Sequence, residues 1–321
     1  MSDVMTPESA ATEWGAHSPV LLSHRENAVY VVEWGGKRAA LRLHRPGYMS
    51  RRAIASELWW MQSLVSQGFP CPAPIPLPDG GLVRKVGDQM ATMVTWVEGS
   101  AIGEGGVLLP GDRPAQARLM ARIGAMMARM HSLSDAMIPP DGFDRPAWDM
   151  DGFLGDKPTW GQFWKNPNLT DRDRALVDEG RIMARQALSS GLLDVGLIHA
   201  DLLRENVFLG PQGLTFIDFD DAGIGFRLYD ITTSLTQSLE DPELPNLAQA
   251  LLRGYDDVRR LSDFDLSMMP IASLLRSLAA LGWVMSRYPA DHPKMPVYIA
   301  RATRSVEALQ RGRNFFLEGF E

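Results

Sequence analysis

The strongest constraint on this chain lies between residues 197 and 230, where polar side chains recur at fixed spacing beside two apolar runs. His199, Asp201 and Asn206 follow an H-x-D-x-x-x-x-N pattern, and Asp218 stands near the end of the second run. A single H-x-D carries almost no information, because such pairs are common in loops. The combined spacing, bracketed by apolar runs, predicts a functional loop.

The apolar runs indicate how this loop is folded. Residues 207–209 and 214–217 are typical of two strands, and Gly210-Pro211-Gln212-Gly213 between them is a turn sequence. A hairpin of this kind brings Asn206, just before it, and Asp218, just after it, to the same end. Mg²⁺ prefers one or two protein oxygens together with phosphate and water oxygens. The pair therefore suits a magnesium–nucleotide site.

Asp201 precedes the amide ligand by five residues and is suited to accept a proton from an attacking hydroxyl. The run from His199-Ala200-Asp201 to Asn206, followed by Ile217-Asp218-Phe219, resembles the loops of the aminoglycoside phosphotransferase and choline kinase family. Ala200 stands where that family has glycine. This exchange matters only if the backbone there needs a positive φ.

The resemblance implies the fold, the cofactors and several roles. It implies an α+β, protein kinase-like two-lobed fold, with a small antiparallel N-terminal sheet carrying one helix and a larger, mainly helical C-terminal lobe. The expected boundaries are 1–95 for the nucleotide-binding lobe, 96–99 for a hinge and 100–321 for the helical lobe. ATP and Mg²⁺ are the implied cofactors, with Asp201 as catalytic base and Asn206 and Asp218 as metal ligands. His199 is expected to brace the loop.

A second group of candidates lies near the N-terminus. Residues 29–34 and 39–43 are predicted strands joined by Gly35-Gly36, a hairpin signal. Alternation along the second strand places Ala40 and Arg42 on one face. The resemblance implies that Ala40 lies against adenine and that Arg42 takes the place of the family's phosphate-binding lysine, a change that is not conservative. A register using Lys37 would put the lysine beside the turn, on the opposite face, so we favour Arg42.

Three further features complete the expected nucleotide site. Residues 50–67 have helical apolar spacing, and Glu57 on this helix follows Arg42 by 15 residues, as the family's paired glutamate does. Asn27 ends the polar segment 23–27, which resembles the short loop that the family places over the phosphates; a plain β-turn is the alternative. The candidate hinge residues are Thr95, Trp96 and Val97. The first 18 residues are expected to form a loose lead-in.

Helices are predicted for most of the remaining chain. Their apolar positions recur at helical spacing in residues 114–133, 171–190, 231–239, 245–255, 263–288 and 296–316. His131 closes an A-x-x-H sequence and is expected to pack or cap. Residues 134–169 are rich in Pro, Gly, Asp and aromatic residues, so acceptor-contacting loops are expected there. Asp230 resembles the family's buried aspartate, which accepts hydrogen bonds from the loop backbone.

Composition narrows the class of partner. The net charge of −7 argues against a nucleic-acid binder, since phosphate backbones attract basic surfaces. The one cysteine, Cys71, excludes an intrachain disulfide, and a small buried apolar role is favoured for it. We find no signal peptide and no uninterrupted apolar run of membrane-spanning length, which favours a cytoplasmic protein without a membrane partner.

These observations favour phosphoryl transfer to a hydroxyl of a small molecule of the aminoglycoside, choline or homoserine type. His44-Arg45-Pro46 and the run from Asp218 to Ala222 also resemble the bacterial stress response kinase A group, so a Ser/Thr protein kinase remains an alternative. A nucleotide-binding pseudokinase is the other, because Arg42 replaces lysine. Asp220 is either an additional ligand for a metal or cationic substrate or a solvated turn charge. The sequence is silent on the oligomeric state.

Overall fold

The structure is a computed structural model that describes residues 5–24, 27–191, 193–314 and 316. Its contacts divide the chain into two compact units. The sheet unit comprises Met1–Ser100, Met137–Arg145 and Phe208–Asp220, and the helical unit comprises Ala101–Ala136, Pro146–Val207 and Asp221–Glu321.

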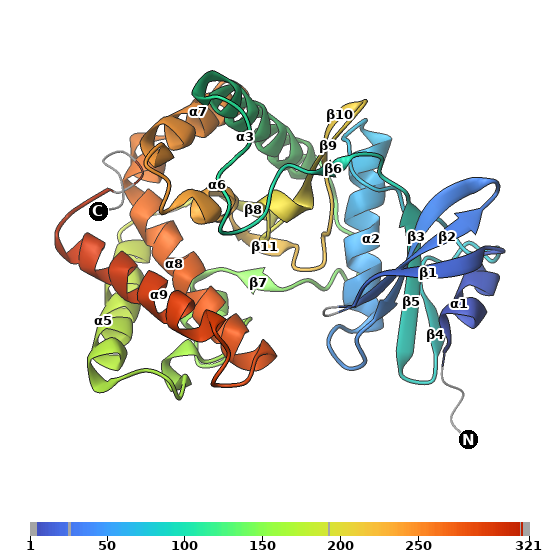
Figure 1. Cartoon of the computed structure of the whole chain (residues 1–321), viewed down its shortest axis with the longest axis horizontal. Coiled ribbons are helices and arrows are strands. Elements are labelled where there is room, and N and C mark those ends of the chain that lie inside the picture. The colour runs from blue at the N-terminus through green and yellow to red at the C-terminus, as the bar shows by residue number, and fades with distance from the viewer. Residues whose placement is uncertain (1–4, 25–26, 192, 315, 317–321) are drawn as a thin grey trace. The chain divides into compact units, whose positions relative to one another are not determined.

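The sheet unit is built on one five-stranded antiparallel sheet (Figure 1). Its strand order is β1-β2-β3-β5-β4, in which β2 and β3 form the predicted glycine hairpin. The elements are β1 (His17–His24), β2 (Ala28–Trp34), β3 (Lys37–His44), α2 (Arg51–Ser66), β4 (Arg84–Val86) and β5 (Gln89–Thr95). Ser50 caps α2, with its side chain accepting from the N–H of Ala53.

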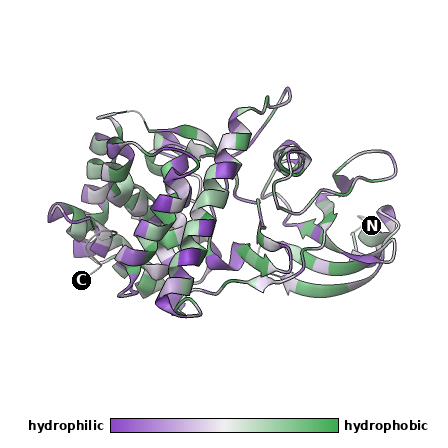
Figure 2. Ribbon diagram, turned by 90° about the horizontal axis from the view of Figure 1, so that it is seen from above, coloured by the Kyte–Doolittle hydropathy of each residue, from purple (hydrophilic) through white to green (hydrophobic). Residues whose placement is uncertain are grey.

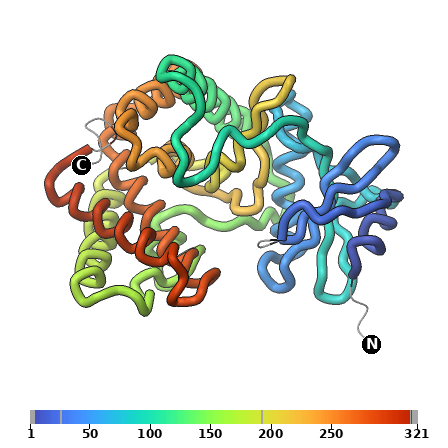
Figure 3. Tube along the Cα trace, viewed as in Figure 1, coloured from blue at the N-terminus to red at the C-terminus, as the bar shows by residue number. Residues whose placement is uncertain are grey.

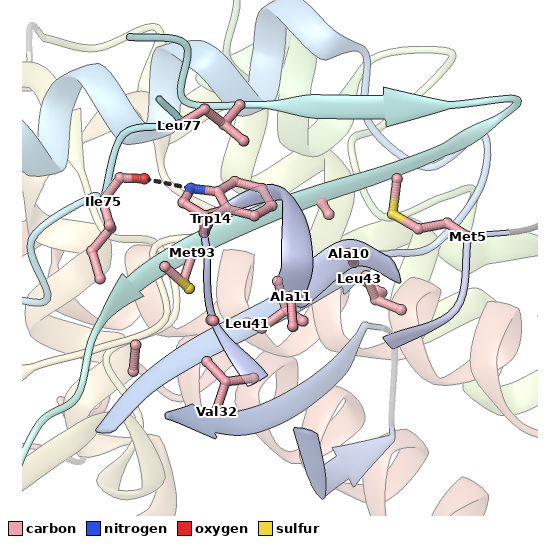
Figure 4. Packing of buried hydrophobic residues seen from close by; sticks show 13 residues of the cluster. Met5, Ala10, Ala11, Trp14, Val32, Leu41, Leu43, Ile75, Leu77 and Met93 are labelled. Atoms are coloured by element: carbon pink, nitrogen blue, oxygen red, sulfur yellow. Dashed lines mark hydrogen bonds between the residues drawn. The ribbon is translucent and has the colours of Figure 1, made fainter. Parts of the chain in front are cut away.

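The start of the chain differs from the prediction. Residues predicted as a loose lead-in form α1 (Pro7–Glu13) and the beginning of β1. Thr6 and Ser9 make a capping box, and Ala10, Ala11 and Trp14 are buried against the sheet. The Trp14 indole N–H donates to the Ile75 carbonyl at 2.8 Å (Figure 4). A seven-residue helix is too short for its apolar periodicity to stand out in the sequence.

Alternation along β3 sorts its side chains as predicted. Leu41 and Leu43 are buried in the core with Val32 and Met93, whereas Ala40 and Arg42 are only half-buried (Figure 4). Colouring by hydropathy shows hydrophobic and paler segments along these strands (Figure 2). The face that carries Arg42 is therefore separate from the face that holds the sheet together.

A buried polar pair joins two strands of this sheet. The Nε2 atom of His44 lies 2.9 Å from the Thr92 hydroxyl, and both residues are buried. Burial lowers the pKa of His44 to about 3, and the positive charges of Arg42 and Arg145 act in the same direction. His44 is therefore neutral in the folded protein at neutral pH.

This shifted pKa predicts acid sensitivity. Between about pH 6.5 and 3 the unfolded chain binds a proton at His44 that the folded chain does not, so its contribution to stability is present above pH 6.5 and is lost as the pH falls. The slope is about 1.4 kcal/mol per pH unit for one proton. We expect His44→Gln to flatten the decline in urea unfolding free energy between pH 7 and 5. The exposed His24→Gln is the control, and equal slopes in all three proteins would contradict the prediction.

The helical unit carries most of the predicted helices. Its elements are α3 (Arg113–Asp135), β7 (Ala147–Trp148), α4 (Met150–Leu154), η1 (Phe163–Lys165), α5 (Asp171–Leu188), β8 (Val195–Ile198), η2 (Arg204–Asn206), β11 (Gly223–Phe226), α6 (Arg227–Leu235), η3 (Thr236–Ser238), α7 (Leu244–Asp256), α8 (Asp263–Arg287) and α9 (Lys294–Gln310). A small sheet has the order β7-β11-β8. The predicted hairpin, which belongs to the sheet unit from Phe208 onward, is formed by β9 (Val207–Gly210) and β10 (Gly213–Phe216), with β6 (Ser100–Ala101) beside β9. The orange α8 and red α9 pack together (Figure 3).

One described helix, α8, is long and apolar enough to cross a membrane by length and composition alone. Its apolar sequence is interrupted by Arg276, so it is not one of the uninterrupted apolar runs considered in the sequence. However, 89% of its apolar window is buried inside the protein. A buried core helix passes the same test, so the finding is weak support for a membrane span.

Two glycines allow α3 and α7 to pack backbone against backbone. A Cβ atom added at Gly124 would lie 2.1 Å from the Leu251 carbonyl oxygen, and one added at Gly254 would lie 1.9 Å from that of Ala121. Such distances are far inside van der Waals contact. The helices must separate if either glycine acquires a side chain.

Gly254→Ala is therefore expected to destabilise the protein despite alanine's better helix propensity. Overpacking costs roughly 1–3 kcal/mol or more, which exceeds the gain of about 1 kcal/mol from replacing glycine in a helix. Chemical denaturation would measure the difference, with Arg122→Ala on the exposed face of α3 as control. An unfolding free energy equal to or above that of the wild type would show that the two helices do not pack this closely.

Candidate functional site

The loop after β8 is held by a buried carboxylate. Asp230, at the start of α6, accepts hydrogen bonds from the backbone N–H groups of His199 at 2.8 Å and Ala200 at 2.7 Å. His131 on α3 lies 3.1 Å from the same carboxylate and 2.8 Å from the Tyr255 hydroxyl. The structure confirms the hydrogen bonds predicted for Asp230 and the packing role predicted for His131.

Burial also fixes the protonation of this anchor. His131 is fully buried, and desolvation lowers its pKa although Asp230 acts in the opposite direction. A neutral imidazole donates through one nitrogen and accepts through the other. It therefore bridges the Asp230 carboxylate and the Tyr255 hydroxyl without adding a second buried charge.

The backbone of the loop is strained at Ala200. Its φ is +67°, in the left-handed region, and its side chain is completely buried. The backbone at this position therefore has the positive φ at which glycine and alanine differ. An alanine is sterically strained there, whereas a glycine is not. The two N–H bonds to Asp230 offset this strain and turn the next residue, Asp201, outward.

Asp201 is held on both oxygens. Arg276 on α8 donates from Nη2 to Oδ1 at 2.9 Å, and Asn206 donates from Nδ2 to Oδ2 at 3.1 Å. The Asp201 side chain is 23% exposed, whereas that of Arg276 is 7% exposed. The carboxylate thus lies at the edge of the helical unit with the arginine behind it. Sequence reasoning missed Arg276, which belongs to no local motif.

The amide of Asn206 has a defined orientation. Its Nδ2 donates both to Asp201 Oδ2 and to the Asp201 backbone carbonyl, at 3.1 and 2.8 Å. Only a nitrogen can make both bonds, so the other atom of the amide is the oxygen. This Oδ1 accepts no hydrogen bond from the residues that the structure describes, which leaves it for a cation.

The segment between Asp201 and Asn206 is pinned along its length. The N–H of Arg204 donates to Gln237 Oε1 at 2.9 Å, and the Gln237 amide donates to Glu205 Oε2 at 2.7 Å. Glu205 Oε1 accepts from the N–H of Gly105 at 3.0 Å. These bonds come from η3 and from the chain before α3, so elements outside the loop fix its backbone and the Glu205 side chain.

In the sheet unit, Arg42 gathers several of the predicted nucleotide-site residues. Its Nη1 lies 3.1 Å from Glu57 Oε1, and its Nη2 lies 2.9 Å from Asp218 Oδ1. Asp220 Oδ1 is 3.6 Å from Nη1. Burial by itself lowers the pKa of Arg42, but the carboxylates of Asp218, Glu57 and Asp220 together raise it above its ordinary value. Arg42 is therefore a permanent cation that bridges α2 and the segment after β10.

Glu57 is the most buried member of this cluster. Its side chain is 3% exposed, and burial raises its pKa above the ordinary value although Arg42 acts in the opposite direction. Its second oxygen lies 3.8 Å from Arg145 and accepts no hydrogen bond. The ion pair with Arg42 agrees with the spacing of 15 residues seen in the sequence.

Asn27 and Asp220 meet within the same unit. Asn27 Nδ2 donates to Asp220 Oδ2 at 3.0 Å, and Asn27 Oδ1 accepts from the N–H of Arg45. Asp220 is only 7% exposed, so the alternative of a solvated turn charge is wrong. Arg25 and Glu26, which precede Asn27 in the predicted phosphate loop, lie outside the described residues.

Arg145 is a second residue that the sequence did not reveal. Its guanidinium donates to the carbonyls of Phe219 and Asp220 and to that of Ala53 on α2. Phe219 is fully buried and packs edge-on against Trp60, with ring centroids 5.2 Å apart. These contacts hold the backbone after Asp218, which itself has a positive φ of 63°.

The expected hinge is partly engaged. The N–H of Thr95 donates to the Ala73 carbonyl at 2.9 Å, so this donor is not free for a nucleotide. Arg38 lies over the Trp96 ring at 4.8 Å and forms a two-bond ion pair with Glu98. These contacts fix the segment that follows β5.

The structure thus brings Arg42, Glu57, Asp218, Asp220 and Asn27 together in the sheet unit, and Asp201 and Asn206 in the helical unit. The described residues contain no cluster of three or more His, Cys, Asp or Glu side chains able to hold a metal alone. Mg²⁺ does not require such a cluster, because it usually keeps water and phosphate oxygens as ligands.

Comparison with known proteins shows the family to which the chain belongs. The model of the APH phosphotransferase enzyme family matches residues 19–264. A homoserine kinase of Rhizobium johnstonii is 32% identical over 222 residues, which cover 66% of this chain and 63% of that enzyme's length.

Two solved structures extend the comparison. A microcompartment-associated aminopropanol kinase superposes with a TM-score of 0.81 at 28% identity, covering 95% of this chain and 97% of that one. An amicoumacin kinase in complex with AMP-PNP, Ca²⁺ and Ami has a TM-score of 0.73 at 20% identity, with 91% and 88% covered, and shows the shared fold. The chain belongs to the phosphotransferase enzyme family and has the protein kinase-like fold.

Proposed function

We propose that this protein transfers the γ-phosphoryl group of ATP to a hydroxyl group of a small molecule. The observation that carries the proposal is the state of Asp201. It is a partly exposed carboxylate held between Arg276 and Asn206, in a loop that Asp230 keeps in a strained shape. A fixed, accessible carboxylate of this kind suits a general base that receives the proton of an attacking hydroxyl.

The cofactor assignment rests on the residues and on the family. Asn206, through its free oxygen, and Asp218 are the proposed Mg²⁺ ligands. When bound, Mg²⁺ neutralises charge on the phosphates of ATP. Arg42 is proposed to hold the phosphates, with Glu57 fixing its direction, because a guanidinium binds phosphate well. Ala40, Asn27, Thr95, Trp96 and Val97 are proposed to line the nucleotide site, Thr95 through groups other than its N–H.

The acceptor is proposed to be a small molecule with both a hydroxyl and an amino group. The similar proteins include a homoserine kinase and an aminopropanol kinase, whose named substrates share these two groups. A release assay for ADP with Mg-ATP should therefore be run with L-homoserine, 1-amino-2-propanol, choline and an aminoglycoside. Release that depends on one of these acceptors supports the proposal. Labelling of a general protein acceptor by γ-labelled ATP would favour a protein kinase instead.

Asp201→Asn is the decisive variant for the catalytic role. The substitution keeps the size of the side chain but removes the proton acceptor, so kcat should fall by about 10²-fold or more. Affinity for Mg-ATP, measured by calorimetry, should change little because the variant retains the nucleotide-binding residues. The exposed Asp178→Asn on α5 is the matched control. Turnover at the wild-type rate in Asp201→Asn would remove this residue from catalysis.

Asp218→Asn addresses the metal role. Asparagine tolerates the positive φ of this position but lacks the negative charge. We expect a higher Mg²⁺ concentration for half-maximal thermal stabilisation by ATP, whereas Asp88→Asn, an exposed change in the same unit, should leave it unaltered. If the Mg²⁺ requirement is the same in both variants and the wild type, Asp218 is not a metal ligand.

A further inference from the structure

Arg276 is a charged residue in the most apolar helix of the protein. It lies near the middle of α8, among the buried residues Ser273, Leu274, Leu275, Ser277 and Leu278. Burying a cation is costly unless a partner compensates the charge. The carboxylate partner is Asp201, at 2.9 Å, on a loop 75 residues earlier in the chain.

The side from which Arg276 contacts Asp201 distinguishes direct substrate binding from an effect exerted through Asp201. Arg276 is 7% exposed and Asp201 is 23% exposed, so the arginine approaches the carboxylate from the inside of the helical unit. An arginine that bound the acceptor or the phosphates would need to be exposed beside the carboxylate. The Arg276 guanidinium can therefore act on the reaction only through Asp201.

Neighbouring groups fix the plane of the guanidinium. It lies over the Trp160 ring at 4.9 Å, and the Trp160 N–H donates to Asp221 at 3.2 Å. Its Nη1 is 3.4 Å from both the Ala200 carbonyl and the Tyr229 hydroxyl. Asp221 holds the Trp160 ring, and the ring in turn lies against the Arg276 guanidinium. In this orientation the guanidinium Nη2 points at Asp201.

The pair is not arranged for maximum stability. The Arg276 Nε is buried without a hydrogen-bond partner among the described residues, and both Nη1 contacts are long. An unsatisfied buried donor costs free energy, and a well-packed apolar residue often serves stability better than a buried ion pair. The one short contact of this side chain is with the proposed base.

We propose that Arg276 is a positioning residue that holds the Asp201 carboxylate by Oδ1 and so fixes its direction toward the acceptor hydroxyl, while Oδ2 also accepts from Asn206. This inference rests on the proposed function. In the step itself, the acceptor oxygen forms a bond to the γ-phosphorus as the bond from that phosphorus to the ADP oxygen breaks. The hydroxyl proton passes to Asp201, and ADP leaves with the electron pair. Arg276 neither gives nor receives a proton.

Arg276→Met, which retains the length but not the charge, should lower kcat by roughly 10- to 100-fold, since a small misplacement of a catalytic group has an effect of this size. The KM for Mg-ATP should stay within about threefold, because Arg276 belongs to no proposed nucleotide contact. Arg276→Lys restores the charge without the fork and should recover part of kcat. The assay uses the acceptor that the panel selects or, without one, the slow release of ADP with water as acceptor.

The comparison of kcat with KM in the two arginine variants gives a readout that a structural role would not move. A general loss of folded enzyme would affect both variants alike, whereas a positioning role predicts that Arg276→Lys recovers part of the kcat that Arg276→Met loses, at a similar KM for Mg-ATP. Arg304→Met is the matched control, because Arg304 is an exposed arginine on α9 whose ion pair is with Glu240.

A double-mutant cycle tests whether Arg276 acts through Asp201. In the Asp201→Asn background, Arg276→Met should cause no further loss of residual turnover, and the effects of the two changes on unfolding free energy should also be non-additive. Additive losses, or wild-type kcat in Arg276→Met, would overturn the inference. If Asp201→Asn itself keeps full turnover, the proposed function fails first, so the two failures are distinguishable.

Discussion

The paired hydrogen bonds from His199 and Ala200 to Asp230 are the interaction on which the helical unit's site depends. The acceptor is a fully buried carboxylate, so the two backbone N–H groups replace their hydrogen bonds to water with strong bonds to the carboxylate oxygens. Their strength lets Ala200 keep a positive φ that alanine otherwise avoids. The backbone turns at Ala200, and the next side chain, that of Asp201, is partly exposed to solvent.

A similar principle operates in the sheet unit with the charges reversed. There a cation, Arg42, collects the carboxylates of Glu57, Asp218 and Asp220, while Arg145 holds the backbone that follows Asp218. A lysine offers one ammonium to such a cluster, whereas the guanidinium fork contacts α2 and Asp218 with different nitrogens. The exchange of lysine for arginine is thus accompanied by a network that uses both arms of the fork.

The sequence predicted those parts of the site that depend on local spacing. The strands, the hairpin, the helix with Glu57 and the loop motif follow from alternation, turn residues and short-range patterns. It did not predict α1, whose seven residues are too few to show periodicity, or the positive φ of Ala200, which depends on Asp230 30 residues away. Arg145 and Arg276 were missed for the same reason, because only the folded chain brings them to the carbonyls and carboxylate that they contact.

The missed residues share a physical property that local patterns cannot show. Each is a buried arginine whose charge or donors are satisfied by groups at least 70 positions away in sequence, Phe219 for Arg145 and Asp201 for Arg276. In the sequence of α8 taken alone, Arg276 only interrupts the apolar pattern, and nothing nearby in sequence indicates a partner for its charge. In the folded unit it is tolerable only because Asp201 lies opposite, so the cost of burying each charge is tied to the position of the other. The two side chains therefore constrain each other, and the Asp201 carboxylate is held by a helix that belongs to the core.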